Sequence, residues 1–272
     1  MVIVDGKKLA EEILNELKLF FEQRKISLAI ISVGVKNEAT ESFVRQKQKV
    51  ADILGVKLEC FNMDNGNFSN KSLRGKINEI ARKKSIHSII VQLPLPENIK
   101  TQYVLNAIPV EKDPDCLNER SLGALLAGRL KILPPAVEVV KFIFQKYYIS
   151  LNNKKCVMVG VGRLVGGPIA SWLMQQKGTV SVVNEFTASV QEFVSAADIV
   201  ISGAGRPELI KNNWIKKGAV VIDFGCSFRD GKITGDIDWR GSEANLVVPT
   251  PGGTGPILVA MLFSNIKKLA ES

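Results

Sequence analysis

Histidine is almost absent from this sequence, which has His87 as its only one among 272 residues. A Ser-His-Asp triad needs a histidine as its base, and histidine-rich metal sites need several. Because His87 lies inside an apolar stretch that runs to Gln92, both mechanisms are disfavoured. Proton transfer in this protein is therefore expected to use Lys, Asp, Glu, Tyr or water.

Closely spaced cysteines are also lacking. The four cysteines stand far apart and form no C-x-x-C pair: Cys60, Cys116, Cys156 and Cys226. This spacing predicts neither a zinc site nor a disulfide framework, so we expect reduced thiols and no bound metal.

The sequence has no long apolar run and no concentrated basic tract. No run approaches the roughly 18 residues of a membrane span, and charged residues begin at Asp5 and Lys7, so we expect a cytoplasmic protein without a signal peptide or membrane anchor. The net charge is +9, but the lysines are spread over every predicted helix, which favours solvated faces over nucleic-acid binding. A basic surface also suits an anionic small substrate.

What the sequence does contain is an alternation of helical and strand patterns. A chain of 272 residues, 46% of them hydrophobic, favours two domains. Residues 7–24 carry Leu9, Ile13, Leu17 and Phe20 at helical spacing, and an apolar strand is predicted at 27–33. The alternation continues with helices at 39–54 and 72–84 and strands at 56–61 and 88–92. This order predicts a mainly parallel sheet covered by helices.

A second alternating block follows a Pro-, Asp-, Asn- and Gly-rich stretch at 108–135, which we interpret as loop and crossover. After a helix at 137–148, strands are predicted at 156–159, 179–183, 198–202 and 219–223, with helices at 164–176, 189–195 and 207–215 between them. The fold class is therefore α/β with two lobes, the second a doubly wound, Rossmann-like dinucleotide-binding domain. The helix predicted at 255–270 is apolar on most faces and is expected to return to the first lobe.

A glycine-rich turn separates the first strand and helix of the second block. It reads Val159-Gly160-Val161-Gly162-Arg163-Leu164-Val165-Gly166, a G-x-G-x-x-x-G pattern. Gly160 and Gly162 would let the backbone approach a pyrophosphate, to which the following helix presents amide hydrogens and a positive dipole end. The extra residue before Gly166 departs from the usual spacing, and a tight turn with no ligand is the alternative.

Glu185 closes the strand at 179–183, about 20 residues beyond the glycine turn. An acid at this place usually binds the adenosine ribose hydroxyls, and it would repel the extra phosphate of NADP while tolerating NAD. An ordinary exposed loop acid is the alternative.

Phe43 and Lys47 are four residues apart and therefore share one face of a predicted helix. Without further evidence, Phe43 would be read as a core residue and Lys47 as a surface residue. Three further motifs follow in order: Val91-Gln92-Leu93-Pro94-Leu95-Pro96, Lys112-Asp113-Pro114-Asp115 and Thr250-Pro251-Gly252-Gly253-Thr254-Gly255-Pro256. In this order and spacing the chain, from Asp5 to its last helix, resembles the bifunctional methylenetetrahydrofolate dehydrogenase/cyclohydrolase family.

The resemblance implies a role for each lobe and for particular residues. A folate-binding catalytic domain would span 1–134, with 255–272 returning to it, and a dinucleotide-binding domain would span 135–254. Phe43 and Lys47 match the family's Tyr-x-x-x-Lys, Gln92 its active-site glutamine and Asp115 its pterin-contacting aspartate. Substrate-binding residues would also include Pro251, Gly252 and Gly253. Cofactor-binding residues would be Gly160, Val161, Gly162, Arg163, Val165, Gly166, Glu185 and Cys226. The resemblance also implies a homodimer.

The implied chemistry fits these residue types. Transfer of a hydride from methylenetetrahydrofolate to nicotinamide needs positioning more than a protein acid or base. Hydrolysis of the methenyl product to 10-formyltetrahydrofolate needs proton transfer, which a lysine with a pKa lowered by partial burial can perform. For Gln92 the alternative is a strand-end amide that satisfies backbone groups, and for Asp115 a turn-forming acid beside Pro114.

The sequence departs from the family pattern at several places. The family's P-C-T-P appears as Ile132-Leu133-Pro134-Pro135 and its K-D-V-D-G as Lys112-Asp113-Pro114-Asp115-Cys116, which bears on substrate contacts. Phe43 lacks the hydroxyl of the family tyrosine, which bears on hydrolysis. The family implies NADP, but Gly160-Val161-Gly162 replaces the usual G-R-S and Glu185 replaces a small or basic residue. Three alternatives follow: NAD is used, Arg163 restores some phosphate binding, or cofactor binding has been lost.

Three functions stay open on this sequence: a bifunctional enzyme, a monofunctional NAD-linked dehydrogenase, and a folate- or nucleotide-binding homologue with little turnover. The joint presence of Lys47, Gln92 and Asp115 speaks against the third.

Overall fold

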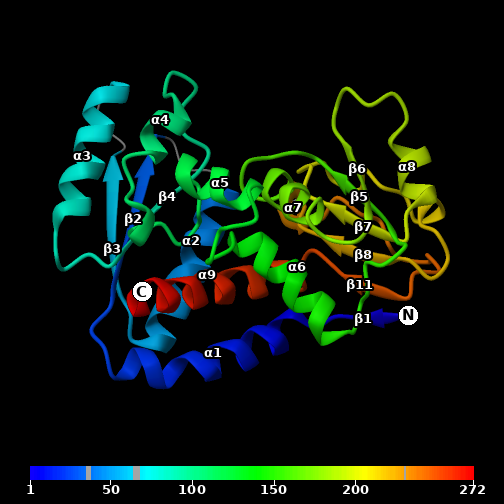
Figure 1. Ribbon diagram of the computed structural model, residues 1–272, viewed down its shortest axis with the longest axis horizontal. Coiled ribbons are helices and arrows are strands. Elements are labelled where there is room, and N and C mark those ends of the chain that lie inside the picture. Colours follow the sequence, from blue (N-terminus) through cyan, green and yellow to red (C-terminus); the bar gives the residue numbers. More distant parts are fainter. Residues whose placement is uncertain (35–37, 64–67, 230) are drawn as a thin grey trace. The chain divides into compact units, whose positions relative to one another are not determined.

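The computed structural model describes residues 1–34, 38–63, 68–229 and 231–272, and they form two compact units (Figure 1). The three-stranded unit comprises residues 11–135 and 259–272, and the six-stranded unit comprises residues 1–10 and 136–258. The first ten residues thus lie in the six-stranded unit, whereas the family resemblance implied a folate-binding domain that begins at residue 1. The reason is that Val2 and Ile3 pair with Leu246 and Val247.

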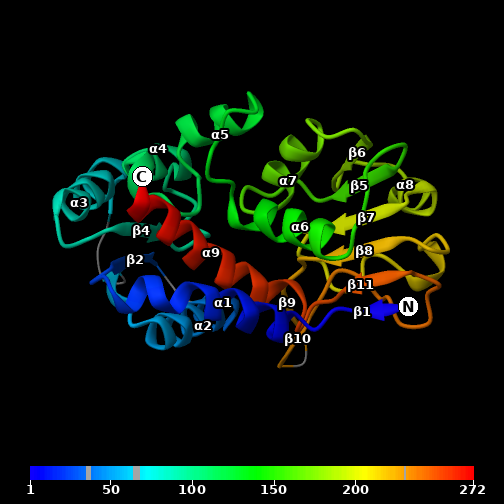
Figure 2. The same cartoon turned by 60° about the horizontal axis from the view of Figure 1, so that its bottom comes forward.

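The three-stranded unit is built on a parallel sheet in the order β3-β2-β4. Its strands are β2 (Ser27–Val33), β3 (Lys57–Met63) and β4 (Ser88–Val91), and its helices include α2 (Glu38–Leu54), α3 (Asn70–Arg82), α4 (Thr101–Leu105) and α5 (Glu119–Leu126). The central strand β2 is buried over all but its last residue, which matches its continuous apolar sequence. Figures 1 and 2 show α3 beside this sheet, and its residues Leu73, Ile77 and Ile80 are fully buried.

Helices α1 (Gly6–Glu22) and α9 (Thr254–Glu271) come from opposite ends of the chain and meet in the three-stranded unit. Leu9, Ile13 and Leu17 are buried, as their spacing predicted. At the end of α1, the ring of Phe21 packs edge-on against that of Phe263 on α9, with centroids 6.4 Å apart. The expected return of the C-terminal helix to the first lobe is confirmed.

The six-stranded unit is built on a parallel sheet in the order β1-β11-β8-β7-β5-β6. The strands are β1 (Val2–Ile3), β5 (Lys155–Val159), β6 (Thr179–Val183), β7 (Ile199–Ser202), β8 (Val220–Asp223) and β11 (Leu246–Val248); the helices are α6 (Pro135–Lys146), α7 (Gly166–Leu173) and α8 (Val190–Ala196). Figure 2 shows β1 at the edge of the sheet beside β11. The chain runs from β5 outward to β6 and then returns to β7 on the other side of β5. The predicted doubly wound topology is confirmed. In such sheets ligands bind at the carboxyl ends of the strands, at the point where the strand order reverses.

Two predictions of local structure are wrong. Residues 207–215 form no α-helix: they contain a short 3-10 helix, η2 (Asn212–Trp214), and an isolated parallel bridge between Ile210 and Ile237. Backbone pairing with residues 235–238 replaces the helical bonds, for example from Glu208 N to the Gly235 oxygen at 3.0 Å. The stretch 108–135 is not all loop, because it holds a 3-10 helix, η1 (Val110–Lys112), and α5, whose first turn is capped by the Asn118 side chain.

The remaining strands, β9 (Ser227–Arg229) and β10 (Lys232–Thr234), form an antiparallel pair after β8. Within the described ranges, no helix combines the length and apolar character that a membrane crossing requires.

The single histidine has a structural partner. Nδ1 of His87 accepts a hydrogen bond from Ser27 N at 3.1 Å, just where β2 begins. His87 therefore ties the start of β2 to the segment that leads into β4.

Candidate active site

Lys47 and Gln92 are joined directly in the three-stranded unit. Lys47 lies on α2, and its Nζ donates to Oε1 of Gln92 at 3.1 Å. Gln92 follows β4, where its backbone N donates to the Ile31 oxygen of β2 and its Nε2 donates to the Leu93 oxygen at 3.3 Å. The side-chain amide is therefore held at both ends, which fixes the position of the lysine amine.

Asp115 completes this group. Lys47 and Asp115 are both half-buried and interact electrostatically. Burial lowers the pKa of Lys47, and the Asp115 charge only partly opposes this effect. Burial likewise raises the pKa of Asp115, against the influence of Lys47. The structure thus brings together an amine, an amide and a carboxyl, with the pKa of the amine shifted toward the range useful for proton transfer.

The loop that carries Asp115 is held by residues that are not among the predicted site residues. Asn265 of α9 is fully buried, and its Nδ2 donates to the Pro114 oxygen at 2.9 Å and to the Leu133 oxygen at 2.8 Å. Asp113 is buried and accepts from Asn118 N at 2.8 Å. The available signal for Asn265 was an amide on a helix that is otherwise apolar on most faces.

Lys112 connects the same loop to the segment between α3 and β4. Its Nζ donates to three backbone oxygens: those of Ala81 at 2.8 Å, Lys83 at 3.2 Å and Ile86 at 2.6 Å. Two of these residues lie at the end of α3, where carbonyl groups lack helical partners. Lys112 therefore connects the end of α3 to the loop that leads to Asp115.

Phe43 lies one helical turn before Lys47 on α2 and is half-buried. The four-residue spacing places both side chains on one face of the helix. The site therefore has an aromatic ring beside its amine but no phenolic hydroxyl at that position.

The glycine turn lies in the six-stranded unit directly after β5, at the point where the strand order reverses between β6 and β7. Gly160 has a φ of +88°, and a Cβ there would lie 2.8 Å from both Cα of Ala204 and the oxygen of Gly203. A Cβ at Gly166 would collide with the oxygen of Gly160. By contrast, a Cβ at Gly162 would meet only the Gly203 oxygen, at 4.0 Å. Gly160 and Gly166 thus close the turn, whereas the open space beside Gly162 fits the backbone approach that a dinucleotide pyrophosphate needs.

Other predicted cofactor residues surround this turn. Val161 and Arg163 are exposed, Val165 is half-buried, and α7 begins only at Gly166. Glu185 is exposed in a turn after β6, where Asn184 Oδ1 accepts from Phe186 N at 3.0 Å. Because Gly160 N donates to the Val183 oxygen at 2.8 Å, this turn adjoins the glycine turn.

Cys226 lies after β8 and is half-buried. Burial raises the pKa of its thiol, and the negative charges of Asp236 and Asp223 add to the effect. The thiol is therefore a neutral packing group rather than an activated nucleophile.

Pro251, Gly252 and Gly253 form the turn that precedes α9. Gly252 has a φ of +92°, and its oxygen accepts from Gly6 N at 3.0 Å. A Cβ at Gly253 would collide with the oxygen of Pro249. Their contact with substrate stays a prediction.

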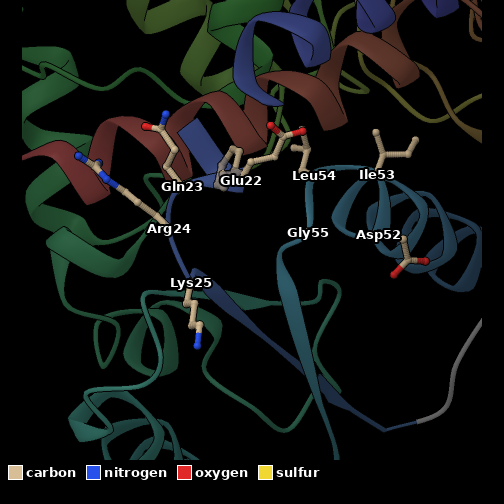
Figure 3. A pocket seen from close by; sticks show the side chains of 9 residues that line it. Glu22, Gln23, Arg24, Lys25, Asp52, Ile53, Leu54 and Gly55 are labelled. Carbon is tan, nitrogen blue, oxygen red and sulfur yellow. The ribbon is translucent and has the colours of Figure 1, made fainter. Parts of the chain in front are cut away.

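A hollow of about 490 Å³ lies where α1 and α2 end (Figure 3). It is lined by residues 21–25 and 52–55, which include the acidic Glu22 and Asp52 and the basic Arg24 and Lys25. None of the predicted site residues is among those that line it. Among the described residues, no cluster of His, Cys, Asp and Glu could hold a metal ion.

Comparison with known proteins matches both halves of the chain. Residues 4–115 match the catalytic domain, and residues 134–272 the NAD(P)-binding domain, of tetrahydrofolate dehydrogenase/cyclohydrolase. The bifunctional protein FolD of Wolbachia sp. subsp. Drosophila simulans (strain wRi) is 36% identical over 278 residues, covering 97% of this chain and 93% of the relative.

Solved structures give the same result. The bifunctional FolD enzyme of Campylobacter jejuni has 32% identity and a TM-score of 0.92, covering 100% of this chain and 99% of that one. The Trypanosoma brucei enzyme, complexed with NADP and an inhibitor, has 31% identity and a TM-score of 0.92 over 99% of this chain and 97% of that one. These matches span the elements that carry the Lys47 group and the glycine turn, and the chain belongs to the tetrahydrofolate dehydrogenase/cyclohydrolase family.

Proposed function

We propose that this protein oxidises 5,10-methylenetetrahydrofolate to 5,10-methenyltetrahydrofolate with a nicotinamide dinucleotide and then hydrolyses the product to 10-formyltetrahydrofolate. The observation that carries the proposal is the amine of Lys47, held by Gln92 beside Asp115 with its pKa lowered by burial. Membership of the family over both halves of the chain supports the same activities.

In the oxidation, the protein's own residues bind and orient. When bound, the nicotinamide ring supplies the acceptor for a hydride from the methylene carbon. Asp115 accepts hydrogen bonds from the amino group and ring nitrogen of the pterin. The glycine turn after β5 holds the pyrophosphate through backbone amides. No protein acid or base is required, because the positive charge that develops on the folate is stabilised by its own nitrogen.

In the hydrolysis, Lys47 moves protons. Water adds its oxygen to the methenyl carbon and loses a proton. The bond from that carbon to the pterin-side nitrogen then breaks as the nitrogen gains a proton, and the hydroxyl left on the carbon releases its own proton to solvent to become the formyl oxygen. A neutral Lys47 Nζ accepts the proton from water and returns it to the departing nitrogen. Gln92 Oε1 keeps the amine in place during both transfers, since it accepts from Nζ at 3.1 Å.

The proposed dinucleotide is NAD in preference to NADP, although the family resemblance implies NADP. The exposed carboxylate of Glu185 stands two residues past Val183, at the end of the strand beside the glycine turn. An acid at this place favours free ribose hydroxyls and repels a phosphate. Arg163 is the residue that would counteract this preference.

A monofunctional NAD-linked dehydrogenase is the second candidate, because Phe43 has no hydroxyl to take part in the hydrolysis. One set of assays distinguishes the candidates: purified protein with methylenetetrahydrofolate and either NAD or NADP, followed by hydrolysis of methenyltetrahydrofolate without dinucleotide. Both reactions are expected. Reduction of the dinucleotide without hydrolysis would support the monofunctional enzyme, and binding without either reaction would overturn the proposal.

We also propose a cytoplasmic homodimer. Within the described chain β6 pairs only with β5, so its outer edge offers backbone groups to a second copy. Val182 on this strand is 45% exposed, and Phe186 after it is 86% exposed. Sedimentation of the purified protein at a monomer mass would contradict this assembly.

A further inference from the structure

Two buried carboxylates lie side by side in the six-stranded unit. Asp223 is the last residue of β8, and Asp236 follows β10; both side chains are fully buried. Asp236 N donates to Oδ1 of Asp223 at 3.1 Å, which puts the two residues in direct contact. Burying a carboxylate costs free energy unless hydrogen-bond donors surround it. The donors to this pair therefore identify the segments that the two carboxylates hold in place.

The donors to Asp236 come from one loop. Its Oδ2 accepts from Ser202 Oγ at 2.8 Å, Ala204 N at 2.7 Å and Gly205 N at 3.2 Å, and its Oδ1 accepts from Arg206 N at 2.8 Å. Three successive backbone N–H groups therefore converge on one carboxylate, as in an anion-binding nest. Asp236 dictates the conformation of residues 203–206, which follow β7.

This loop packs directly against the glycine turn. A Cβ at Gly160 would lie 2.8 Å from Cα of Ala204, and a Cβ at Gly203 would lie 2.7 Å from Cγ1 of Val165. At such close packing, a small shift of residues 203–204 must displace the turn. The conformation set by Asp236 is thus transmitted to the proposed pyrophosphate site.

Asp223 holds the neighbouring segments. Its Oδ1 also accepts from Gly225 N at 2.8 Å, and its Oδ2 accepts from Ile237 N at 3.1 Å. Its backbone oxygen accepts from the hydroxyls of Thr250 and Thr254, each at 2.6 Å. Burial and the charge of Asp236 raise the pKa of Asp223 to about 7. One residue therefore fixes the loop with Cys226 and the two threonines that flank Pro251, Gly252 and Gly253.

We infer that Asp236 and Asp223 are positioning residues for the dinucleotide, acting through the loop 203–206 and the glycine turn rather than by contact with a ligand. The inference rests on the proposed function, which supplies the ligand. This positioning role affects dinucleotide reduction but not methenyl hydrolysis, because hydrolysis consumes no dinucleotide and uses Lys47 in the other unit. A defect at Asp236, whose bonds reach the loop 203–206, is expected to weaken dinucleotide binding and to leave hydrolysis intact.

The test compares Asp236→Asn with the matched control Asp238→Asn, two residues further along and only half-buried. In the first variant an amide NH₂ replaces one acceptor and faces backbone N–H groups. The dissociation constants of NADH and NADPH are measured by calorimetry, and KM and kcat by dinucleotide reduction. Asp236→Asn is expected to raise the dissociation constant and KM of the preferred dinucleotide about tenfold, the loss typical of one hydrogen bond to a charged group. Methenyl hydrolysis and the control stay within about twofold.

Ser202→Ala provides a milder second variant that keeps the carboxylate and removes one donor, with an expected rise of about threefold. Two results would overturn the inference: wild-type dinucleotide affinity in folded Asp236→Asn and Ser202→Ala, or an equal loss of dinucleotide binding and methenyl hydrolysis. If the wild type binds a dinucleotide but reduces none, the proposed function fails while the binding comparison still decides the inference. A wild type that binds neither dinucleotide overturns both.

Discussion

Nζ of Lys47 lies 3.1 Å from Oε1 of Gln92, and the amide that accepts this bond is itself tied to the Leu93 oxygen. The amine is therefore held by a residue at the end of β4 rather than by the helix that carries it. Since burial also lowers the pKa of Lys47, the pair combines a fixed position with the capacity to exist as a neutral base.

Replacing Lys47 by Met is expected to reduce methenyl hydrolysis by at least about 100-fold, the usual effect of losing a general base. Folate binding should persist because Phe43, Gln92 and Asp115 stay. In the wild type the neutral amine becomes more abundant as pH rises, so hydrolysis should increase with an apparent pKa below the usual lysine value of 10.5. The control is Lys49→Met on the exposed face of α2; hydrolysis that survived in K47M would disprove the role of the lysine.

Replacing Phe43 by Tyr restores the hydroxyl that the family pattern has one turn before the lysine. One additional hydrogen bond of about 1.4 kcal/mol in the transition state would accelerate methenyl hydrolysis about tenfold. Dinucleotide reduction should change little, because that step needs no proton transfer. Phe193→Tyr on α8 introduces the same hydroxyl elsewhere, and equal hydrolysis in F43Y and wild type would contradict the expectation.

Replacing Glu185 by Arg is expected to shift the ratio of kcat/KM for NADP over NAD upward by at least about tenfold. The substitution removes a repulsive carboxylate and supplies a guanidinium that can bind a phosphate with two hydrogen bonds. Glu192→Arg on α8 makes the same change of charge at another exposed position. If both variants shift the ratio equally, general surface charge rather than position 185 determines the preference.

Lys112→Met should destabilise the three-stranded unit by about 2 kcal/mol or more, because three backbone oxygens lose their common donor. Denaturant unfolding would measure the loss. Lys84→Met, at an exposed position in the same region, should have almost no effect. Equal stability of the two variants would show that the bonds from Lys112 contribute nothing.

Asp113→Asn should change how stability depends on pH. Burial raises the pKa of Asp113 from 3.8 to about 7, so the folded state retains a proton that the unfolded state releases. The stability that this proton contributes is present below pH 3.8 and lost as pH rises to about 7, at about 1.4 kcal/mol per pKa unit. The free energy of unfolding between pH 4.5 and 7.5 should therefore fall more steeply in the wild type than in the variant. Parallel curves would refute the shift.

Elements defined by their own local sequence pattern were predicted correctly, whereas elements defined by hydrogen bonds to distant segments were not. The strand at 27–33 was predicted with its observed bounds because its apolar residues are continuous and local. Residues 207–215 were misassigned because their hydrogen-bond partners lie at 235–238, beyond any local pattern. The short strands β1 and β11 were missed for the same reason: each is completed by a distant strand.

The same distinction applies to the candidate site. Lys47 and Gln92 were predicted from motifs, and the structure brings them within hydrogen-bonding distance. Asn265 and Asp236 were not predicted, because each holds backbone groups that are distant in sequence. Asn265 bonds an oxygen 151 positions away, and Asp236 bonds a backbone N–H group 32 positions away. Such residues carry no periodicity or spacing signal before the chain is folded.

The pairing of Val2 and Ile3 with residues 246 and 247 has a consequence for biosynthesis. During translation the first strand is made more than 240 residues before its partner. The six-stranded sheet therefore cannot be completed until residues 246–248 have been made. A nascent chain arrested before residue 246 would keep its N-terminal strand unpaired and available to chaperones.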